Sequence, residues 1–185
     1  MICNVNSFFY LYDMEKKDIG ILAKEDVFKL IGKEWMLVSA GNIDNFNTMT
    51  ASWGCLGWLW NRPVAVVFIR PERYTYGFVE DNAKVTLSFF GQECRKALQI
   101  CGTKSGKDCD KVAEAGLHPV CLEGGVVGFS EARLTLVCRK LFKSEMRQDD
   151  FIDPEVLSAW YHNGPGGSLH SIYIAEIEEV YSTQD

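Results

Sequence analysis

The sequence lacks several patterns that would assign it to a common class. It has no run of about eighteen apolar residues, so we expect no membrane-spanning helix. Its seven cysteines contain no C-x-x-C pair, and we expect reduced, mostly buried thiols in a cytoplasmic protein. A G-x-G-x-x-G fingerprint for a dinucleotide is missing. His118 and Cys121 have a loosely metal-like spacing, but no second pair of ligands accompanies them, so no metal site is predicted.

Basic residues are also scarce. Lys and Arg number 19 against 25 Asp and Glu, which gives a net charge of −6. A broad nucleic-acid surface would need a basic face, so we expect no nucleic-acid partner.

The N-terminal residues do not have the pattern of an export signal. Phe8–Tyr12 is apolar but short, and no basic segment precedes it. Met14 begins a second, more usual opening, so residues 1–13 are either an upstream extension or an ordinary arm. We expect an N-terminal arm over residues 1–24 and one domain over residues 25–185.

Hydrophobic periodicity predicts more strands than helices. The predicted strands are Trp35–Ala40, Asn47–Leu56 with a candidate break at Gly54, Val64–Arg70, Lys84–Phe90, Val126–Phe129, Arg133–Phe142 and Leu169–Tyr181. The predicted helical segments are Asp26–Ile31, Glu72–Asp81, Gln92–Cys101 followed by Gly102, Asp108–Ala115 and Asp153–Tyr161. We expect Val126–Phe129 and Arg133–Phe142 to pair with each other. Because no regular β-α-β alternation occurs, a closed antiparallel barrel with attached helices is favoured.

The segment Asn47–Trp53, N-T-M-T-A-S-W, combines small side chains with hydroxyls. At a period of two, Thr48, Thr50 and Ser52 share one face. Small residues let a ligand approach the backbone, and hydroxyls and N–H groups can hydrogen-bond a flat polar ring. A plain edge strand is the alternative, since Thr favours strands in any case.

A buried strand over Val64–Ile69 leads directly to Arg70 and Arg73, with Thr75 close behind. Two guanidiniums and a hydroxyl suit a phosphate monoester, because Arg offers a planar fork of donors. The alternative is a solvated surface pair, the usual situation for Arg.

The segment Ser105–Lys107 is similar to part of a phosphate-binding loop, but its spacing is wrong. Gly102 and Gly106 enclose three residues instead of four, and Asp108 stands where Ser or Thr should be. An ordinary turn between two helices is as well supported as a binding role.

Several sequence motifs occur in the same order as in one known family. They are N-T-M-T-A-S-W-G, L-W-N-R-P-V-A, I-R-P-E-R-Y-T, V-T-L-S-F-F, C-G-T-K-S-G-K-D, E-A-R-L-T-L-V-C-R-K-L-F and F-I-D-P, between about Glu25 and Tyr181. They resemble the flavin reductase-like family of FMN-binding split β-barrels, close to its flavoredoxin branch. The resemblance implies a mainly β fold, an antiparallel Greek-key split β-barrel with several attached helices. It also implies a homodimer with FMN near the subunit interface.

The resemblance further implies a set of FMN-binding residues and no catalytic side chain, because the flavin carries the chemistry. The set is Asn47, Thr48, Met49, Thr50, Ala51, Ser52, Trp53, Arg70, Arg73, Tyr74, Thr75, Phe89, Ser105 and Lys107. Residues 70–75 match the region that holds the FMN phosphate. Trp53 and Phe89 are core aromatics first and would in addition wall the isoalloxazine ring. His170 is interpreted as a packed histidine.

The last segment departs from the family pattern. It reads L-H-S-I-Y-I-A-E-I over Leu169–Ile177, with Ala175 in place of Gly and Ser171 in place of a basic residue. A substrate-binding or second-subunit role of this motif is therefore not implied, whereas the motifs that would bind FMN are unchanged.

Two functions fit these features. One is an oxidoreductase of the flavin reductase type, in which electrons move from NAD(P)H through FMN to free flavin, iron or a protein. The other is a flavoredoxin-like carrier that exchanges electrons with a redox partner protein without nicotinamide turnover, and the acidic balance suits basic partners. A barrel that binds another phosphorylated heterocycle, or no ligand, is the third alternative.

Overall fold

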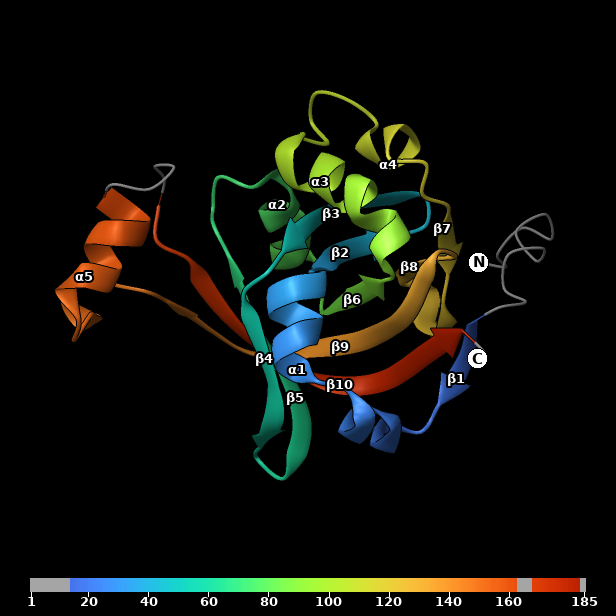
Figure 1. The fold of residues 1–185 in the computed structure, drawn as a ribbon, viewed down its shortest axis with the longest axis horizontal. Helices are drawn as coiled ribbons and strands as arrows, with labels where there is room; N and C mark the ends of the chain where they lie inside the picture. Colours follow the sequence, from blue (N-terminus) through green and yellow to red (C-terminus); the bar gives the residue numbers. More distant parts are fainter. Residues whose placement is uncertain (1–13, 163–167, 184–185) are drawn as a thin grey trace.

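The computed structural model describes residues 14–162 and 168–183, and most of its strands form one antiparallel sheet. The strands of this sheet are β1 (Met14–Lys17), β2 (Met36–Asn42), β3 (Asn45–Ala51), β4 (Gly54–Leu59), β5 (Arg62–Ile69), β6 (Lys84–Phe90), β9 (Ala132–Glu145) and β10 (Ser171–Thr183). Their order is β3-β2-β6-β9-β10-β5-β4, with β1 paired to β10 (Figure 1). Because sequence neighbours are often not sheet neighbours, the order is a Greek key and not a meander. This is the predicted fold class.

The central strands are buried on both faces because each face has its own core. Met36 and Val38 of β2 belong to a cluster inside the barrel, and Leu37 between them belongs to a second cluster on the outer side. That second cluster is covered by Leu98 and its neighbours from a helix, and by Phe129. Burying each such side chain contributes roughly 1.5–3 kcal/mol, so the period-two pattern explains why these segments form strands.

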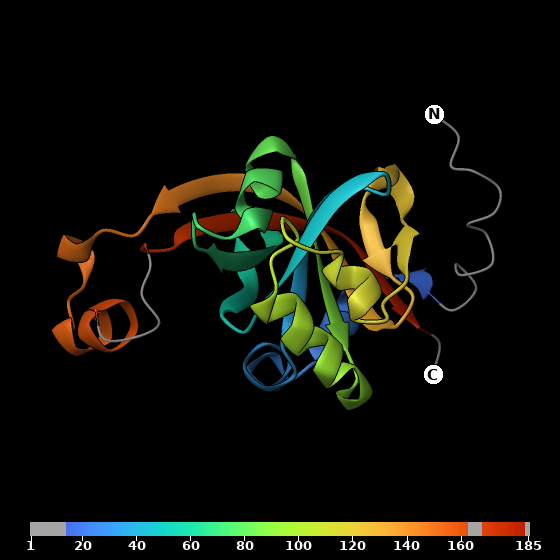
Figure 2. The same cartoon turned by 90° about the horizontal axis from the view of Figure 1, so that it is seen from above.

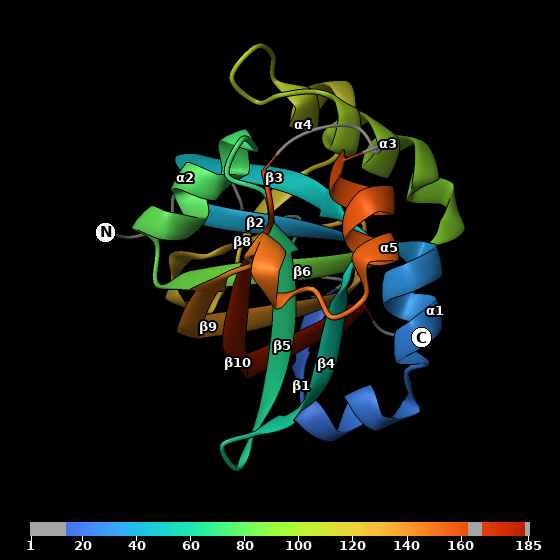
Figure 3. The ribbon, with the colours of Figure 1, turned by 90° about the vertical axis from the view of Figure 1, so that its left-hand side faces the viewer.

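The barrel is split between β3 and β4. These strands lie at the two ends of the sheet order, yet only Ser52 and Trp53 separate them in the chain. The sheet therefore curls until its edges face each other, as the view in Figure 3 shows. The predicted strand Asn47–Leu56 is accordingly two strands, and the break lies just before the predicted Gly54.

Helices and short segments cover the barrel. They are η2 (Ile19–Lys24), α1 (Val27–Lys29), η3 (Leu30–Glu34), α2 (Tyr74–Asp81), η4 (Gln92–Cys94), α3 (Arg95–Thr103), α4 (Lys111–Glu114), η5 (Glu123–Gly125), η6 (Gln148–Asp150), α5 (Pro154–Leu157) and η7 (Ser158–His162). A separate two-stranded sheet consists of β7 (Pro119–Cys121) and β8 (Val127–Phe129). No helix in the described part of the chain is long and apolar enough to cross a membrane.

Aspartate caps begin three helices near the predicted positions. The side chains of Asp26, Asp110 and Asp153 each accept a hydrogen bond from a backbone N–H of the first turn. Gly116 follows α4 with a φ of +69°, a conformation that favours glycine. These local signals are why the helix predictions near residues 26, 110 and 153 are confirmed.

Two predictions need correction. Gly102 does not end its helix, because α3 continues through Thr103. A Cβ on Gly102 would lie 3.2 Å from Cβ of Thr50, so this glycine allows close packing of α3 on β3. The strand β8 pairs with β7 and not with β9, because a third strand, missed in the sequence, occupies its edge.

The segment between β9 and β10 extends beyond the barrel. The long strands β9 and β10 carry α5 and η7 away from the main body, as Figure 2 shows from above. The predicted loop Asn163–Ser168 falls outside the described residues, except for Ser168.

Candidate functional site

A cavity of about 250 Å³ opens at the split between the two edge strands. Its walls come from the end of β3, the end of β5, η7 and the residue before β10. The lining residues are Met49, Thr50, Ala51, Ser52, Trp53, Phe68, Arg70, Arg73, Trp160 and His170. We call this space the ring cavity, because aromatic and small side chains leave a site suited to a flat heterocycle.

A recess of about 100 Å³ lies next to the ring cavity and shares Arg73 with it. Its lining is polar: Glu72, Arg73, Tyr74, Thr75, Thr103, Lys104, Ser105 and Lys111. We call this space the recess. Hydroxyls and cations converge there from the start of α2, the end of α3 and α4, which is the donor set that binds a phosphate group.

Arg73 links the two spaces. It precedes α2, and its Nη2 donates a hydrogen bond of 2.8 Å to the backbone oxygen of Gly102 at the end of α3. Burial lowers the pKa of this guanidinium. Thr75 beside it is fully buried, and its hydroxyl accepts a 2.8 Å hydrogen bond from Nδ2 of Asn47. Asn47 therefore fixes the wall of the recess.

The two arginines that were predicted to share one phosphate lie in different spaces. Arg73 reaches the recess, whereas Arg70 lines only the ring cavity. Nη2 of Arg70 donates a 3.2 Å hydrogen bond to the backbone oxygen of Trp160, and the guanidinium lies 5.3 Å from the ring centre of Tyr161. Arg70 directly follows β5 and Arg73 directly precedes α2, so the two side chains reach different spaces.

The other predicted residues fall into three groups. Met49, Thr50, Ala51, Ser52 and Trp53 line the ring cavity, and Tyr74, Thr75 and Ser105 line the recess. Thr48 is fully buried and hydrogen-bonds Ser39, so its hydroxyl faces the sheet. Phe89 lies in the barrel core and Lys107 on an exposed loop, and neither lines the ring cavity or the recess.

Seven lining residues were not predicted: Phe68, Glu72, Thr103, Lys104, Lys111, Trp160 and His170. His170 was noticed but interpreted only as a packed residue. Trp160 meets Trp53 edge to face, with ring centres 5.2 Å apart. No local pattern marks Trp160 and His170, because they reach the site from η7 and from the residue before β10, far in the sequence from the predicted segments.

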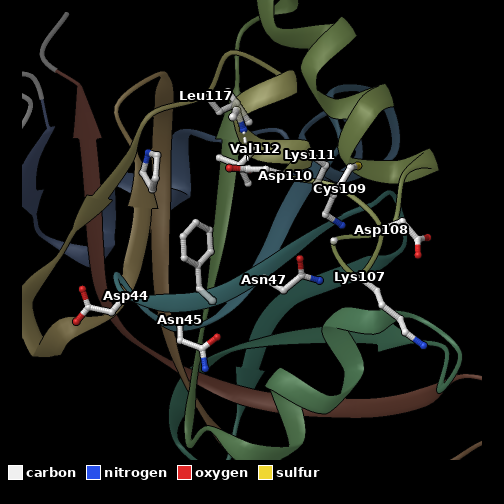
Figure 4. Close-up of a pocket in the computed structure, with 14 residues that line it drawn as sticks. Asp44, Asn45, Asn47, Lys107, Asp108, Cys109, Asp110, Lys111, Val112 and Leu117 are labelled. Carbon is white, nitrogen blue, oxygen red and sulfur yellow. Dashed lines mark hydrogen bonds between the residues drawn. The ribbon is translucent and has the colours of Figure 1, made fainter.

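A larger pocket of about 560 Å³ lies on the far side of the Lys107 loop (Figure 4). Asp44, Asp108 and Asp110 line it. Lys107 and Lys111 also line it, but the three carboxylates outnumber these two lysines, so this pocket suits a phosphorylated ligand less well than the recess despite its size.

The family profile described as "Flavin reductase like domain" matches residues 28–185. The chain belongs to the flavin reductase-like domain family. Among curated proteins, a sequence comparison finds no significant match.

Solved structures share the flavin reductase-like fold. An FMN-binding domain of a flavin reductases-like enzyme from Shewanella baltica has a TM-score of 0.65 and 18% identity, over 92% of this chain and 78% of the other. Flavoredoxin from Desulfovibrio vulgaris has a TM-score of 0.62 and 20% identity over 92% and 78%. An NADH:FAD oxidoreductase from Streptomyces globisporus has a TM-score of 0.57 and 15% identity over 80% and 73%.

His170 of this flavin reductase-like domain is 8% exposed and lies against Trp53 and Tyr161. Its Nδ1 is 2.8 Å from the hydroxyl of Tyr161. Burial, and after it the charge of Arg70, lower the pKa of His170 to about 4, and Glu72 opposes them. The imidazole is therefore neutral at neutral pH.

We expect His170 to make the fold less stable in acid. The folded protein resists protonating this imidazole until about pH 4, whereas the unfolded chain takes up the proton near pH 6.5. Between these values the unfolded state binds more protons, so stability falls as pH falls. The loss from this residue at pH 5 is about 2 kcal/mol. Denaturant unfolding should show a shallower acid loss in His170→Gln than in the wild type, and equal slopes would contradict this.

The cysteines are expected to be dispensable for redox activity. Those in the described residues are free, and burial raises the pKa of Cys101 to about 11 and also raises those of Cys94 and Cys109. Thiols with raised pKa values are poor nucleophiles. Alkylated protein and a variant with Cys101→Ala and Cys109→Ala should keep the wild-type rate of flavin reduction. Lost activity with FMN still bound would indicate a dithiol relay.

Within the described residues, no group of three His, Cys, Asp or Glu is arranged to hold a metal ion.

Proposed function

We propose that the protein binds FMN, with the isoalloxazine ring in the ring cavity and the phosphate in the recess. The observation that carries this is the position of Arg73, which lines both spaces. An aromatic cavity joined to a cationic recess matches a flat heterocycle with a phosphate at the end of a flexible chain. The similarity to structures described as FMN-binding supports the same conclusion.

Two glycines fit this proposal. A Cβ on Gly106 would lie 2.2 Å from Oδ1 of Asn47, so a side chain there would displace the residue that holds Thr75. Gly102 lets α3 approach β3 and places its backbone oxygen on Arg73. Both residues bring the loop and the end of α3 close enough to enclose the recess.

We propose further that the protein is an oxidoreductase of the flavin reductase type. Bound FMN would accept reducing equivalents from NAD(P)H and pass them to an acceptor. The protein would bind the flavin and set the polarity around its ring, while the flavin carries the redox chemistry. Trp53 and Trp160 would form the aromatic wall beside the ring, and Arg73 would neutralise the negative tail of the ligand.

FMN is favoured over FAD. The recess is small and closed by Arg73, Thr75 and Lys111, which suits a terminal phosphate. In FAD that phosphate is part of a pyrophosphate and carries one negative charge, whereas the terminal phosphate of FMN carries up to two. Arg73 and Lys111 would therefore attract the FMN phosphate more strongly. Fluorescence titration of the apoprotein should give a lower Kd for FMN, and equal or tighter FAD binding would contradict this.

Two measurements test the function. The visible spectrum of the purified protein, or of apoprotein after addition of FMN, reports whether flavin binds. Stopped-flow mixing of the holoprotein with NADH and with NADPH then reports whether a nicotinamide reduces it. Rapid bleaching supports the reductase. Bound flavin that only a redox partner protein reduces would favour the flavoredoxin-like carrier, to which the similarity with flavoredoxin points.

We also propose a homodimer. The hairpin of β4 and β5 exposes Trp58, Leu59 and Trp60, and Phe142 of β9 lies beside Trp60 with ring centres 6.4 Å apart. A contiguous exposed apolar patch is unusual on a monomer. Sedimentation velocity at micromolar concentration should show the dimer, and a monomer with FMN bound would overturn the proposal.

A further inference from the structure

A second cavity lies next to the ring cavity and shares a wall with it. It has a volume of about 380 Å³ and lies where α5 and η7 extend beyond the barrel (Figure 2). Trp53, Phe68 and Trp160 line both cavities. The remaining lining residues are Met146, Phe151, Val156 and Tyr161. We call this space the arm pocket.

The arm pocket is apolar and uncharged. Its lining side chains are aromatic, aliphatic or thioether, and none of them carries a charge. Tyr161 contributes a hydroxyl, which already lies 2.8 Å from Nδ1 of His170 and 3.4 Å from Sδ of Met146. Arg70 lines the ring cavity but not the arm pocket. Because an ion would lose its hydration here without gaining a partner, the arm pocket disfavours charged molecules.

Contacts among the lining residues fix the shape of the arm pocket. Trp160 meets Trp53 edge to face with ring centres 5.2 Å apart, and Phe151 meets Tyr161 at 5.6 Å. The hydrogen bond from Nη2 of Arg70 to the backbone oxygen of Trp160 joins η7 to the end of β5. An aromatic cavity that is formed before its ligand arrives loses little entropy when a flat molecule enters.

A gap that a second copy of the chain covers is the alternative. Val156 and Ile152 are exposed, which a contact between copies would explain. The exposed patch of the proposed dimer, however, includes Trp58, Trp60 and Phe142, and none of these lines the arm pocket. The volume falls within the range of small-molecule sites, roughly 300–1,000 Å³. Together with the wall shared with the ring cavity, this volume favours a small ligand.

We propose that the arm pocket binds an uncharged aromatic molecule of about two fused rings, which serves as the electron acceptor. This inference rests on the proposed flavin function and names the class of its acceptor. Trp53, Phe68 and Trp160 would contact both ligands, so the acceptor would lie beside the flavin. A bound quinone would take two electrons and two protons from the reduced flavin and become a hydroquinone, which returns the flavin to its oxidised form.

Binding is tested first without any redox reaction. Isothermal titration calorimetry should detect binding of 2-naphthol to the apoprotein and to the FMN-saturated protein alike. The same ring with a sulfonate group, 2-naphthol-6-sulfonate, should bind at least about tenfold more weakly, because its charge would be desolvated. No binding of 2-naphthol, or its displacement by FMN, would overturn the proposal.

Val156 offers variants that reach the arm pocket alone. It lines this pocket and not the ring cavity, and it is 43% exposed, so Val156→Glu and Val156→Trp should fold. Each should raise the Kd for 2-naphthol at least about tenfold, by adding a charge or by filling the space, and leave that for FMN within about twofold. The matched controls Ile152→Glu and Ile152→Trp alter a fully exposed side chain outside the pocket, and should leave both Kd values within about twofold.

The acceptor role is tested by mixing chemically reduced holoprotein with 2,3-dimethyl-1,4-naphthoquinone in the absence of oxygen. The two methyl groups prevent thiols from adding to the quinone ring. Val156→Glu should slow reoxidation of the flavin by this quinone at least about tenfold, and leave reoxidation by ferricyanide, a charged acceptor, within about twofold. Unchanged reoxidation by the quinone, or equal slowing with both acceptors, would refute the acceptor role.

These results also separate the inference from the function itself. If the protein binds no FMN and 2-naphthol binding still depends on Val156, the flavin function fails and the arm pocket stands. If FMN binds and the Val156 variants bind 2-naphthol like the wild type, the function stands and the arm pocket is refuted. A changed sedimentation coefficient of Val156→Glu with unchanged 2-naphthol binding would assign this surface to a second copy and likewise overturn the proposal.

Discussion

Replacing Arg73 with Ala is expected to weaken FMN binding by about 1.5–3 kcal/mol, or roughly 10- to 150-fold in Kd. The guanidinium is partly buried, lines both the ring cavity and the recess, and has its pKa lowered by burial, so it is poorly hydrated before a ligand arrives. Its interaction with a phosphate is therefore less screened than that of a surface arginine. Fluorescence titration of the apoprotein with FMN measures the change.

Riboflavin and Arg70 provide the controls for this variant. Riboflavin lacks the phosphate, so Arg73→Ala should hardly change its Kd. Arg70→Ala should affect FMN and riboflavin equally, because Arg70 lines the ring cavity and not the recess. If Arg73→Ala weakens both ligands by the same factor, the guanidinium acts through its hydrogen bond to Gly102 and the fold, not through the phosphate.

Replacing Phe89 with Ala is expected to destabilise the fold by about 3–5 kcal/mol. Phe89 lies in β6, is fully buried and belongs to the cluster inside the barrel. Removing its ring leaves a cavity among rigid strands that cannot collapse, which is the costliest kind of core substitution. Urea unfolding of the apoprotein measures the loss, and the matched control Phe28→Ala, at a side chain 91% exposed, should change stability by less than about 0.5 kcal/mol.

The milder Phe89→Leu decides between the two roles assigned to this residue. In the structure Phe89 does not line the ring cavity, so this variant should lose some stability and keep the FMN spectrum and Kd. A changed flavin spectrum at little cost in stability would mean that Phe89 contacts the ring after all.

The buried cations would also allow an acidic protein to bind an acidic ligand such as the proposed FMN. The net charge of −6 is spread over the surface, where water and salt screen it. Arg73 and Lys111 are few, but they act at short range in a space with little water. The local donor set therefore outweighs the overall charge, which matters mainly for long-range encounter with partners.

The sequence alone determined what depends on near neighbours in the chain. Alternation at a period of two marked the strands, and Asp153 with Pro154 after it marked a helix start, because both signals act within a few residues. The sequence motifs around Thr50 and Arg73 resemble those of a family, and this resemblance predicted the ligand-binding segments. Those residues do line the ring cavity and the recess.

Only the tertiary structure decided which side chains meet. The register of β10 on β5 sets Ser171 opposite Ile69, which brings His170 close to Arg70 and into the ring cavity. Trp160 reaches Trp53 across more than a hundred residues, and Lys111 meets Arg73 because two helix ends converge. Phe89, predicted beside the ring, lies instead in the core inside the barrel. These contacts follow from long-range strand pairing and burial, whose energies depend on the whole fold and leave no local pattern in the sequence.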